Sequence, residues 1–253
     1  MKSQTDLFWN ERALNEKDQD KVNIGDIVQR EFEYTFVEKH LRPTDNLLEV
    51  GCGNGFLSQY LREKVNFLDS FDYAENMVEK AVELRGQKNN RFFHDDVTDP
   101  KNFKESYSAI LCIRVLINLK DLESQKKAIA NLHKSLEKGG MLLLIEGYKD
   151  GFDALSELRQ SIGLTPLTPA AINFYSKLND ILPLLNEFFE IQDYFHSGMY
   201  DFLTRVVYPA LVGSSNVIEA GEFHQKILPL IKTFNLDGLS PYARLHGYKL
   251  IKK

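Results

Sequence analysis

Residues 46–55 read Asn-Leu-Leu-Glu-Val-Gly-Cys-Gly-Asn-Gly, a short apolar run that ends in three glycines at alternate positions. A short apolar run bounded by glycine is typical of a buried strand. Glycine is favoured where the backbone turns tightly and a ligand comes close, because a Cβ atom would collide there. The following residues have a helical pattern, and a helix N-terminus directs free N–H groups toward such a turn. The stretch therefore predicts the nucleotide-binding corner of an open α/β sheet.

The spacing of these glycines distinguishes between two classes of nucleotide-binding protein. The dinucleotide pattern of NAD-dependent oxidoreductases has glycine at the first, third and sixth positions, and the sixth position counted from Gly51 is Phe56. Here the glycines are Gly51, Gly53 and Gly55, and the acidic residue Glu49 precedes them. This E-x-G-x-G-x-G sequence resembles motif I of the class I S-adenosylmethionine-dependent methyltransferases. A tight turn without a ligand is the alternative, and tight NADH binding would indicate an oxidoreductase instead.

Composition excludes several other classes of protein. The net charge of -5 argues against a general nucleic-acid-binding protein, whose footprint is usually basic. No run approaches the roughly 18 apolar residues that a membrane helix requires, and residues 1–16 lack the apolar core of a signal peptide. Cys52 and Cys112 lie far apart in predicted buried elements, which fits a reduced compartment. We therefore expect a cytoplasmic protein without nucleic-acid or membrane partners. The oligomeric state is left open.

An acidic residue, Asp72, ends the second predicted strand, residues 66–71. It follows the glycine corner by about 20 positions, the spacing at which a carboxylate binds the ribose hydroxyl groups of a nucleotide. A carboxylate suits this role because it accepts two O–H donors at once. The alternative role for Asp72 is the N-cap of the predicted helix 75–85.

The resemblance extends over about residues 45–147. In the resembled family an acidic residue after the third strand, here residues 91–94, accepts a hydrogen bond from the adenine amino group, and the next backbone N–H donates to the ring. Asp96 and Val97 match that position, and Asp95 is one residue away; an ordinary polar turn is the alternative. The cofactor implied is S-adenosylmethionine, with S-adenosylhomocysteine as product. The predicted cofactor-binding residues are Glu49, Gly51, Cys52, Gly53, Asp72, Tyr73, Met77, Asp96, Val97, Ile113 and Arg30.

Arg114 follows the fourth predicted strand, residues 109–113. There the resembled fold lines the methionine arm of the cofactor and opens toward the methyl acceptor. A guanidinium at this point would bind an anionic acceptor group or the carboxylate of the cofactor, or it would form an internal salt bridge.

The first 41 residues are expected to form a helical lid over the cofactor, as methyltransferases of this type often carry. Phe8 and Trp9 form an isolated aromatic pair in an otherwise polar stretch, which would also suit a surface helix. Under such a lid, Arg12, Gln29 and Arg30 could reach the carboxylate of the cofactor; solvated or salt-bridged side chains are the alternative.

The second half of the chain predicts the rest of the sheet and a cap. Strands are expected at residues 189–195 and 244–251, with two helices, 200–211 and 218–231, between them. The helix predicted at 177–188 contains Pro183, so a kink or break is expected there. We therefore expect one domain over residues 1–253, with a lid at 1–41, a cofactor-binding core at 42–147 and an acceptor-side half at 148–253. The expected cap covers about residues 199–240.

The predicted fold class is α/β. It is Rossmann-like, with a seven-stranded, mostly parallel sheet, helices on both faces, an antiparallel last strand and a helical cap inserted before that strand. The reaction implied by the resemblance is in-line methyl transfer to an oxygen of a small polar or anionic metabolite: a sugar, a carboxylic acid or a phosphorylated compound. The segment Arg-Val-Leu-Ile-Asn-Leu at 114–119 resembles methyltransferases of bacterial natural-product and surface-polysaccharide pathways. A non-catalytic protein that keeps this fold to hold a partner is the alternative.

No signature identifies the catalytic base, and an anionic acceptor would need none. The candidates for a base are His196, Glu146 and His246. The candidates for acceptor binding are Arg114 and three cap residues, Tyr200, Arg205 and Tyr208, although the cap residues would also suit a solvated face. No metal is expected, because the six histidines are scattered without ligand spacing.

Overall fold

The computed structural model describes residues 3–103, 106–234 and 236–253. Met1 and Lys2 of the predicted lid and Asn235 of the predicted cap lie outside the described residues. Within the described ranges, no helix is long and apolar enough to cross a membrane.

Seven strands form one sheet in the order β3-β2-β1-β4-β5-β7-β6. The strands are β1 (Asn46–Val50), β2 (Phe67–Asp72), β3 (Asn90–His94), β4 (Tyr107–Ile113), β5 (Leu136–Gly147), β6 (Phe189–His196) and β7 (Leu245–Lys252). β7 pairs antiparallel with both β5 and β6, whereas the pairs from β3 to β5 are parallel. The predicted fold class, with its antiparallel last strand, is confirmed.

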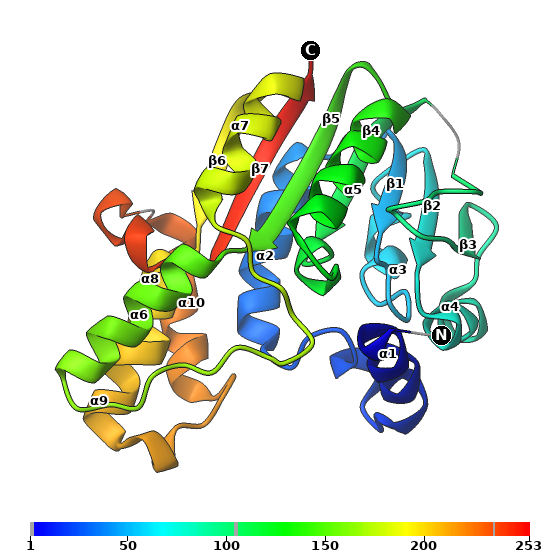
Figure 1. The fold of residues 1–253 in the computed structure, drawn as a ribbon. Coiled ribbons are helices and arrows are strands. Elements are labelled where there is room, and N and C mark those ends of the chain that lie inside the picture. The colour runs from blue at the N-terminus through cyan, green and yellow to red at the C-terminus, as the bar shows by residue number, and fades with distance from the viewer. Residues whose placement is uncertain (1–2, 104–105, 235) are drawn as a thin grey trace.

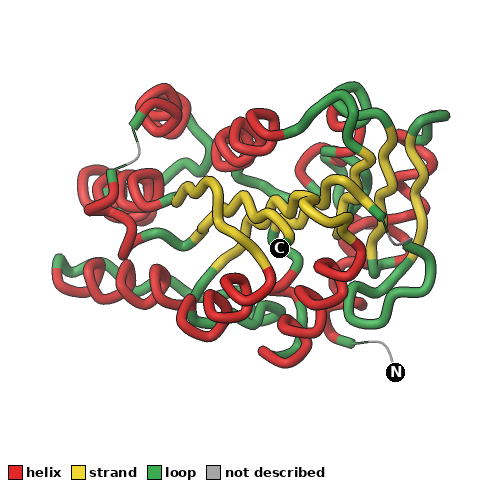
Figure 2. Tube along the Cα trace, turned by 90° about the horizontal axis from the view of Figure 1, so that it is seen from above, coloured by secondary structure: helices red, strands yellow, loops and turns green. Residues whose placement is uncertain are grey.

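Helices cover both faces of the sheet (Figure 1; Figure 2). They are α1 (Gln4–Asn15), α2 (Ile27–His40), α3 (Ser58–Leu61), α4 (Glu75–Arg85), α5 (Leu122–Ser135), α6 (Lys149–Ser161), α7 (Leu178–Phe188), α8 (Gly198–Phe202), α9 (Tyr208–Val212) and α10 (Glu222–Thr233). Short 3-10 turns include η1 (Gln19–Lys21), η2 (Leu116–Asn118), η4 (Ser214–Asn216) and η5 (Asp237–Tyr242).

The two faces of the sheet have separate apolar cores because successive strand residues point to opposite sides. Along β4, Ile110 and Cys112 pack with α5 and α7, whereas Ala109 and Leu111 pack with α2 and α3. A strand buried on both faces has an uninterrupted apolar sequence, and this is why β4 and β5 could be recognised without alternation.

α7 and the α8–α9 helix of the cap each continue through a proline, and α7 differs from the prediction. α7 is assigned as one helix through Pro183, so the predicted break is wrong. In the cap, α8 continues through a π-helical segment, η3 (Leu203–Val207), into α9, which contains Pro209. Proline has no N–H for the carbonyl four residues earlier. Nη1 of Arg159 instead donates to that carbonyl, the oxygen of Arg205, so the segment stays helical.

The carboxyl ends of β1, β2 and β4 meet at one edge of the sheet. Val50 is in register with Phe71 on one side and with Cys112 on the other. The strand order reverses between β1 and β4, and ligands of open α/β sheets bind at such a switch point. Figure 1 shows α1 beside α4 near this edge, with α6 and the cap helices α8, α9 and α10 farther along the sheet.

Candidate cofactor and acceptor site

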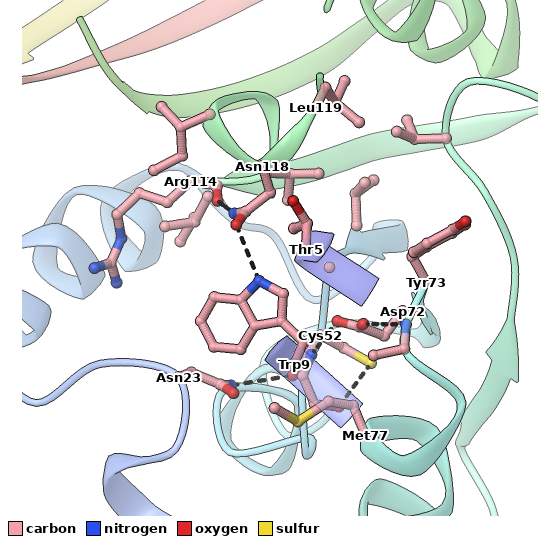
Figure 3. Close-up of a pocket in the computed structure, with 18 of the residues that line it drawn as sticks. Thr5, Trp9, Asn23, Cys52, Asp72, Tyr73, Met77, Arg114, Asn118 and Leu119 are labelled. Atoms are coloured by element: carbon pink, nitrogen blue, oxygen red, sulfur yellow. Dashed lines mark hydrogen bonds between the residues drawn. The ribbon is translucent and has the colours of Figure 1, made fainter. Parts of the chain in front are cut away.

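A cavity of about 580 Å³ lies at the carboxyl ends of β1, β2 and β4, and residues of α1 form one of its walls. Most of the predicted cofactor-binding residues line it (Figure 3). They are Glu49, Gly51, Cys52, Gly53, Asp72, Tyr73, Met77, Asp96, Val97 and Ile113, and Arg114 joins them. The structure therefore brings together at one edge residues of β1, β2 and β4, of the loops after β1 to β4, and of α4.

The glycines of the turn after β1 occupy positions that other residues would not tolerate. Gly51 has φ +71°, and an added Cβ would lie 2.5 Å from Cγ2 of Val115. Gly53 has φ +55°, and a Cβ there would lie 2.1 Å from Oδ1 of Asn23. Since L-residues rarely adopt such φ values, both positions favour glycine. The turn thus presents bare backbone to the cavity.

The carboxylate of Asp72 holds the glycine turn after β1. Its Oδ2 accepts a hydrogen bond from the Gly53 N–H and its Oδ1 accepts one from the Ala74 N–H, each at 2.8 Å. Burial raises the pKa of Asp72, and the two N–H donors oppose this shift. A carboxylate has about four acceptor sites, so two remain for the hydroxyl groups of a ribose. The N-cap of α4 is Ala74, without a side-chain cap, so the alternative role of Asp72 as N-cap is wrong; its contact with the Ala74 N–H holds the turn before the helix.

The two acidic residues after β3 have different surroundings. Asp95 is buried, and its carboxylate accepts hydrogen bonds from the backbone N–H groups of Asp96, Lys101, Asn102 and Phe103. Asp96 lines the cavity and uses Oδ1 for the N–H and hydroxyl of Thr98. Asp95 therefore shapes the turn, and Asp96 is the carboxylate that faces the cavity.

Glu49 lines the cavity but is held from within the protein. Its Oε2 accepts hydrogen bonds from Oγ of Ser58 at 2.5 Å and Oγ of Ser70 at 2.9 Å. Burial raises the pKa of Glu49 to about 7, against the effect of both hydroxyl groups. These contacts tie β1 to α3 and β2, so the acidic residue of the motif also has a structural role.

α1 is fixed on both sides of the cavity. Oδ1 of Asn10 accepts from the Asn76 N–H at the start of α4. On the opposite side, Nε1 of Trp9 donates to Oδ1 of Asn118 in η2 at 2.9 Å (Figure 3). The N-terminal segment thus lies against the cavity. The sequence did not indicate that Trp9 would contact Asn118.

Arg114 directly follows the last residue of β4 and has an unusual backbone conformation, φ +52°. The Arg114 N–H donates to the carbonyl of Ile145, and Nδ2 of Asn118 donates to the carbonyl of Arg114, each at 2.8 Å. Its Nη2 lies 3.4 Å from Oε2 of Glu33, which is fully buried in α2. Both the internal salt bridge and a position at the cavity wall are therefore present in the structure.

The side chains of Arg12 and Arg30, the two arginines of the predicted lid, both donate hydrogen bonds to backbone carbonyls. Arg30 does not line the cavity: its guanidinium donates to the carbonyl of Asp20 and lies 4.1 Å from the ring centroid of Phe56. Arg12 lines the cavity, but its Nε donates to the carbonyl of Val22 at 2.6 Å. The position of Arg30 therefore gives no support to its predicted contact with the cofactor.

Gln29, the third residue assigned to the carboxylate of the cofactor, is buried away from the cavity. It lies between Glu33 and Arg244, where its Nε2 donates to Glu33 and its Oε1 accepts from Arg244. Its side chain is therefore engaged within the protein.

Glu146 is buried beneath the turn that carries Arg114. Its Oε2 accepts from the N–H groups of Leu116 and Ile117 at 2.6 and 3.3 Å, and its Oε1 accepts from the Gly147 N–H. Burial raises the pKa of Glu146 to about 7, and the three N–H donors oppose this shift. Glu146 does not line the cavity, so its position fits the capping role better than that of a base.

The two histidine candidates lie at the ends of β6 and β7, outside the cavity. Nδ1 of His196 accepts from the Gly198 N–H at 3.2 Å, and Nδ1 of His246 lies 2.7 Å from the hydroxyl of Tyr194. Burial lowers the pKa of His246 to about 4. No histidine is found among the described residues that line the cavity.

The three cap residues assigned to acceptor binding also lie elsewhere. The hydroxyl of Tyr200 donates to Oδ2 of Asp26 at 2.6 Å, and Nη2 of Arg205 lies 3.8 Å from the same carboxylate oxygen. Tyr208 stacks on Phe223 with ring centroids 4.4 Å apart. These residues join the cap helices to one another and to the start of α2, and none of them lines the cavity.

Several cavity residues were missed by sequence reasoning. They are chiefly Thr5, Asn23, Tyr34, Asn118, Ile172 and Asn173. Asn23 donates to the carbonyl of Cys52, and its place in the polar segment before α2 carried no recognisable signal. Asn118 lies in the segment that was compared with pathway methyltransferases, but nothing in the sequence indicated its contact with α1.

Comparison with known proteins agrees with this geometry. Residues 47–140 match a family model described as a methyltransferase domain. A malonyl-[acyl-carrier protein] O-methyltransferase from Anoxybacillus flavithermus is 27% identical over 118 residues, which cover 46% of this chain and 44% of that protein. A malonyl-[acyl-carrier protein] O-methyltransferase 2 from Ilyobacter polytropus is 24% identical over 172 residues, which cover 63% and 64%. The chain thus spans less than two thirds of the length of either relative.

A solved structure shares the fold over nearly the whole chain. The N-methyltransferase NodS from Bradyrhizobium japonicum WM9, in complex with S-adenosylhomocysteine, matches 99% of both chains with a TM-score of 0.62 and 14% identity. Similarity at this level of identity concerns the fold. The sheet order and this similarity show that the chain has the Rossmann-like methyltransferase fold, and residues 47–140 resemble a methyltransferase domain.

Proposed function

We propose that the protein transfers a methyl group from S-adenosylmethionine to an oxygen of a small polar or anionic metabolite. The observation that carries this proposal is the cavity at the carboxyl edge of the sheet, where the glycine turn, Asp72 and Asp96 lie together under α1. A sugar, a carboxylic acid and a phosphorylated compound all remain acceptors of the expected chemistry.

The residues present fit the cofactor. An added Cβ at Gly51 or Gly53 would collide with the side chain of Val115 or Asn23, which line the same cavity, so only glycine keeps this turn closely packed beside it. Asp72 would hold the ribose, and Asp96 with the Val97 N–H would hold the adenine. When bound, S-adenosylmethionine supplies an electrophilic methyl group on a sulfonium.

The contribution of the protein is alignment and exclusion of water. Holding donor and acceptor in line can supply roughly 7–11 kcal/mol of the barrier in the most favourable cases. α1 and η2, joined through Trp9 and Asn118, lie on opposite sides of the cavity and would cover the reacting groups.

Cys52 and Cys112 are unpaired and buried, which supports a cytoplasmic location.

Two observations support oxygen as the methylated atom. Both relatives named above are O-methyltransferases that act on a malonyl group held by an acyl-carrier protein. In addition, none of the described residues that line the cavity is a histidine, the usual general base, and an acceptor that is already an anion requires no base.

Cofactor binding can be followed without a label. Trp9 is the one tryptophan of the sequence, and it lines the cavity, so its fluorescence should change when S-adenosylhomocysteine binds. Failure of both cofactor forms to bind at millimolar concentration would overturn the proposal. Incubation with S-adenosylmethionine and metabolite pools, read as methyl mass shifts, then identifies the acceptor; binding without turnover of any pool would favour a non-catalytic protein.

A further inference from the structure

Arg114 differs from the other cations that line the cavity. Arg12 donates to backbone carbonyls of the segment after α1, and Nζ of Lys120 lies 3.6 Å from Asp121. The guanidinium of Arg114 makes no hydrogen bond to any residue that the structure describes, and its Nε is buried without a partner. Since a guanidinium has five N–H donors in a planar fork, this group has unused capacity for a planar anion.

Glu33 neutralises Arg114 only in part. The closest atoms, Nη2 of Arg114 and Oε2 of Glu33, are 3.4 Å apart, and that oxygen accepts no hydrogen bond. The other oxygen, Oε1, is held by Nε2 of Gln29 at 2.8 Å. Burial raises the pKa of Glu33, and Arg114 opposes this shift.

The position of Glu33 is fixed from the cap side. Nη2 of Arg244 donates to Oε1 of Gln29 at 3.1 Å, and Nε of Arg244 donates to Oδ1 of Asp201 in α8 at 2.7 Å. Because Gln29 is held in this chain of contacts, the carboxyl of Glu33 is restrained from turning to form a two-pronged pair with Arg114. The donors of the guanidinium therefore remain available.

The backbone also directs Arg114. A non-glycine residue at φ +52° carries a conformational cost of roughly 1–2 kcal/mol, and such conformations are concentrated at binding sites. The contacts of its N–H with Ile145 and of its carbonyl with Asn118 maintain this conformation. The strained backbone at Arg114 therefore lies in a turn that places its guanidinium at the wall of the cavity.

From these observations we infer that Arg114 is the carboxylate-binding group of the acceptor subsite, and that the acceptor of this enzyme bears a carboxylate. The inference rests on the proposed function, since it assigns a residue to the acceptor of the same reaction. A bidentate contact with the guanidinium would orient the acceptor beside η2 and the indole of Trp9, which Figure 3 shows between Arg114 and Asp72.

The test uses malonate as a carboxylate probe and malonamide as its neutral counterpart. Each is titrated into protein saturated with S-adenosylhomocysteine, at constant ionic strength, with the fluorescence of Trp9 as readout. We expect malonate to bind the unmodified protein and malonamide not to bind. Arg114→Met should weaken malonate binding about 10-fold or more, because a charge-assisted contact is lost. Arg114→Lys, which keeps the charge without the fork, should weaken it less.

Two further variants provide matched controls. Lys120→Met removes another cation from the cavity lining and should weaken malonate binding much less than Arg114→Met does, because Lys120 is paired with Asp121. Glu33→Gln removes the competing carboxyl and should leave malonate affinity equal or tighter. Thermal unfolding of each variant establishes that it folds, and Arg114→Lys keeps the test decisive if Arg114→Met does not fold.

The outcomes separate this inference from the proposed function. If S-adenosylhomocysteine binds but malonate binding is absent, or is the same in all variants, the inference is overturned and the proposed function stands. A loss of S-adenosylhomocysteine affinity in Arg114→Met, with unchanged affinity for methylthioadenosine, which lacks the amino-acid arm, also overturns it, because Arg114 then serves the carboxylate of the cofactor. If the unmodified protein binds neither cofactor form, the proposed function itself fails.

Discussion

Nε1 of Trp9 donates a 2.9 Å hydrogen bond to Oδ1 of Asn118, which lies 109 residues further along the chain. Nδ2 of the same asparagine donates to the carbonyl of Arg114. One amide side chain thus connects the N-terminal helix to the turn after β4, on opposite sides of the cavity (Figure 3). Asn118 therefore contacts both the predicted lid and the turn that holds Arg114.

Trp9→Phe should weaken cofactor binding while leaving the helix in place. The substitution removes the N–H donor and keeps an aromatic ring, so the loss is that of one hydrogen bond, about 1 kcal/mol or roughly 5-fold in Kd. Isothermal titration with S-adenosylhomocysteine measures it. Leu14→Ala, at an exposed position of α1, is the control and should not change Kd. Equal Kd values for Trp9→Phe and the unmodified protein would show that this contact does not hold the lid.

Of the two aspartates in β2, Asp72 should serve cofactor binding and Asp69 should serve stability. Asp72→Ala should raise the Kd for S-adenosylhomocysteine by roughly 30-fold or more, since two hydrogen bonds to hydroxyl groups are lost, while the circular dichroism spectrum stays unchanged. Asp69 is paired with Nε and Nη2 of Arg91, each at 2.7 Å, and lies away from the cavity. Asp69→Asn should lower the free energy of unfolding by about 2 kcal/mol and leave Kd unchanged. Global unfolding of Asp72→Ala would instead assign that residue a structural role.

The glycine corner can be tested by a pair of substitutions. Gly53→Ala should abolish cofactor binding and destabilise the fold by about 1 kcal/mol or more, because φ is +55° and the new Cβ meets the Asn23 side chain. Asn23→Ala in the same chain removes that collision but not the backbone strain. The double variant should therefore recover stability in part, as measured by urea unfolding. Full recovery would show that strain at this position is negligible.

The pH dependence of stability should reveal the buried carboxyl of Glu49. Its pKa is raised from 4.5 to about 7 in the folded protein, so the folded state retains a proton that the unfolded state has lost. The free energy of unfolding should therefore fall as pH rises from about 4.5 to about 7, by at most about 3 kcal/mol from this group, and be flat above. Glu49→Gln should reduce this slope in urea unfolding of the ligand-free protein and leave the contribution of Glu146, whose pKa is also raised to about 7. An unchanged pH profile would contradict the raised pKa.

His246 should contribute a slope of opposite sign. Its pKa is lowered from 6.5 to about 4 by burial, so the unfolded state binds the extra proton between those values. Stability from this group is lost as pH falls from about 6.5 to about 4. His246→Asn should flatten the acidic side of the profile, measured by the same unfolding series. A steeper loss in that variant would exclude this assignment.

The core of the fold could be predicted because its signals are local. The predicted strands 66–71, 91–94, 109–113, 189–195 and 244–251 lie within two residues of β2, β3, β4, β6 and β7, and Gly51, Gly53 and Asp72 line the cavity at the ends of β1, β2 and β4. Asp96 was preferred to Asp95, and the structure shows Asp96 facing the cavity. These residues lie directly after strands, where chain position and spatial position agree.

The assignments outside the core depended on contacts between distant segments. Arg205 pairs with Asp201 and Asp26, and His196 packs beside His246. A sequence shows that such side chains are polar, but it does not show which partner neutralises them. Pro183 was expected to break α7, but packing of Ile181 and Leu185 against the sheet maintains the helix.

The strand order has a consequence for how the chain is assembled during synthesis. β7 is made after β6, yet it lies between β5 and β6 and provides the pairing that connects β6 to the rest of the sheet. Until β7 emerges from the ribosome, β5 has an open edge of unpaired N–H and carbonyl groups, which invites pairing with other chains. The growing polypeptide is therefore most prone to aggregation after its cofactor-binding half has formed and before its final strand is inserted.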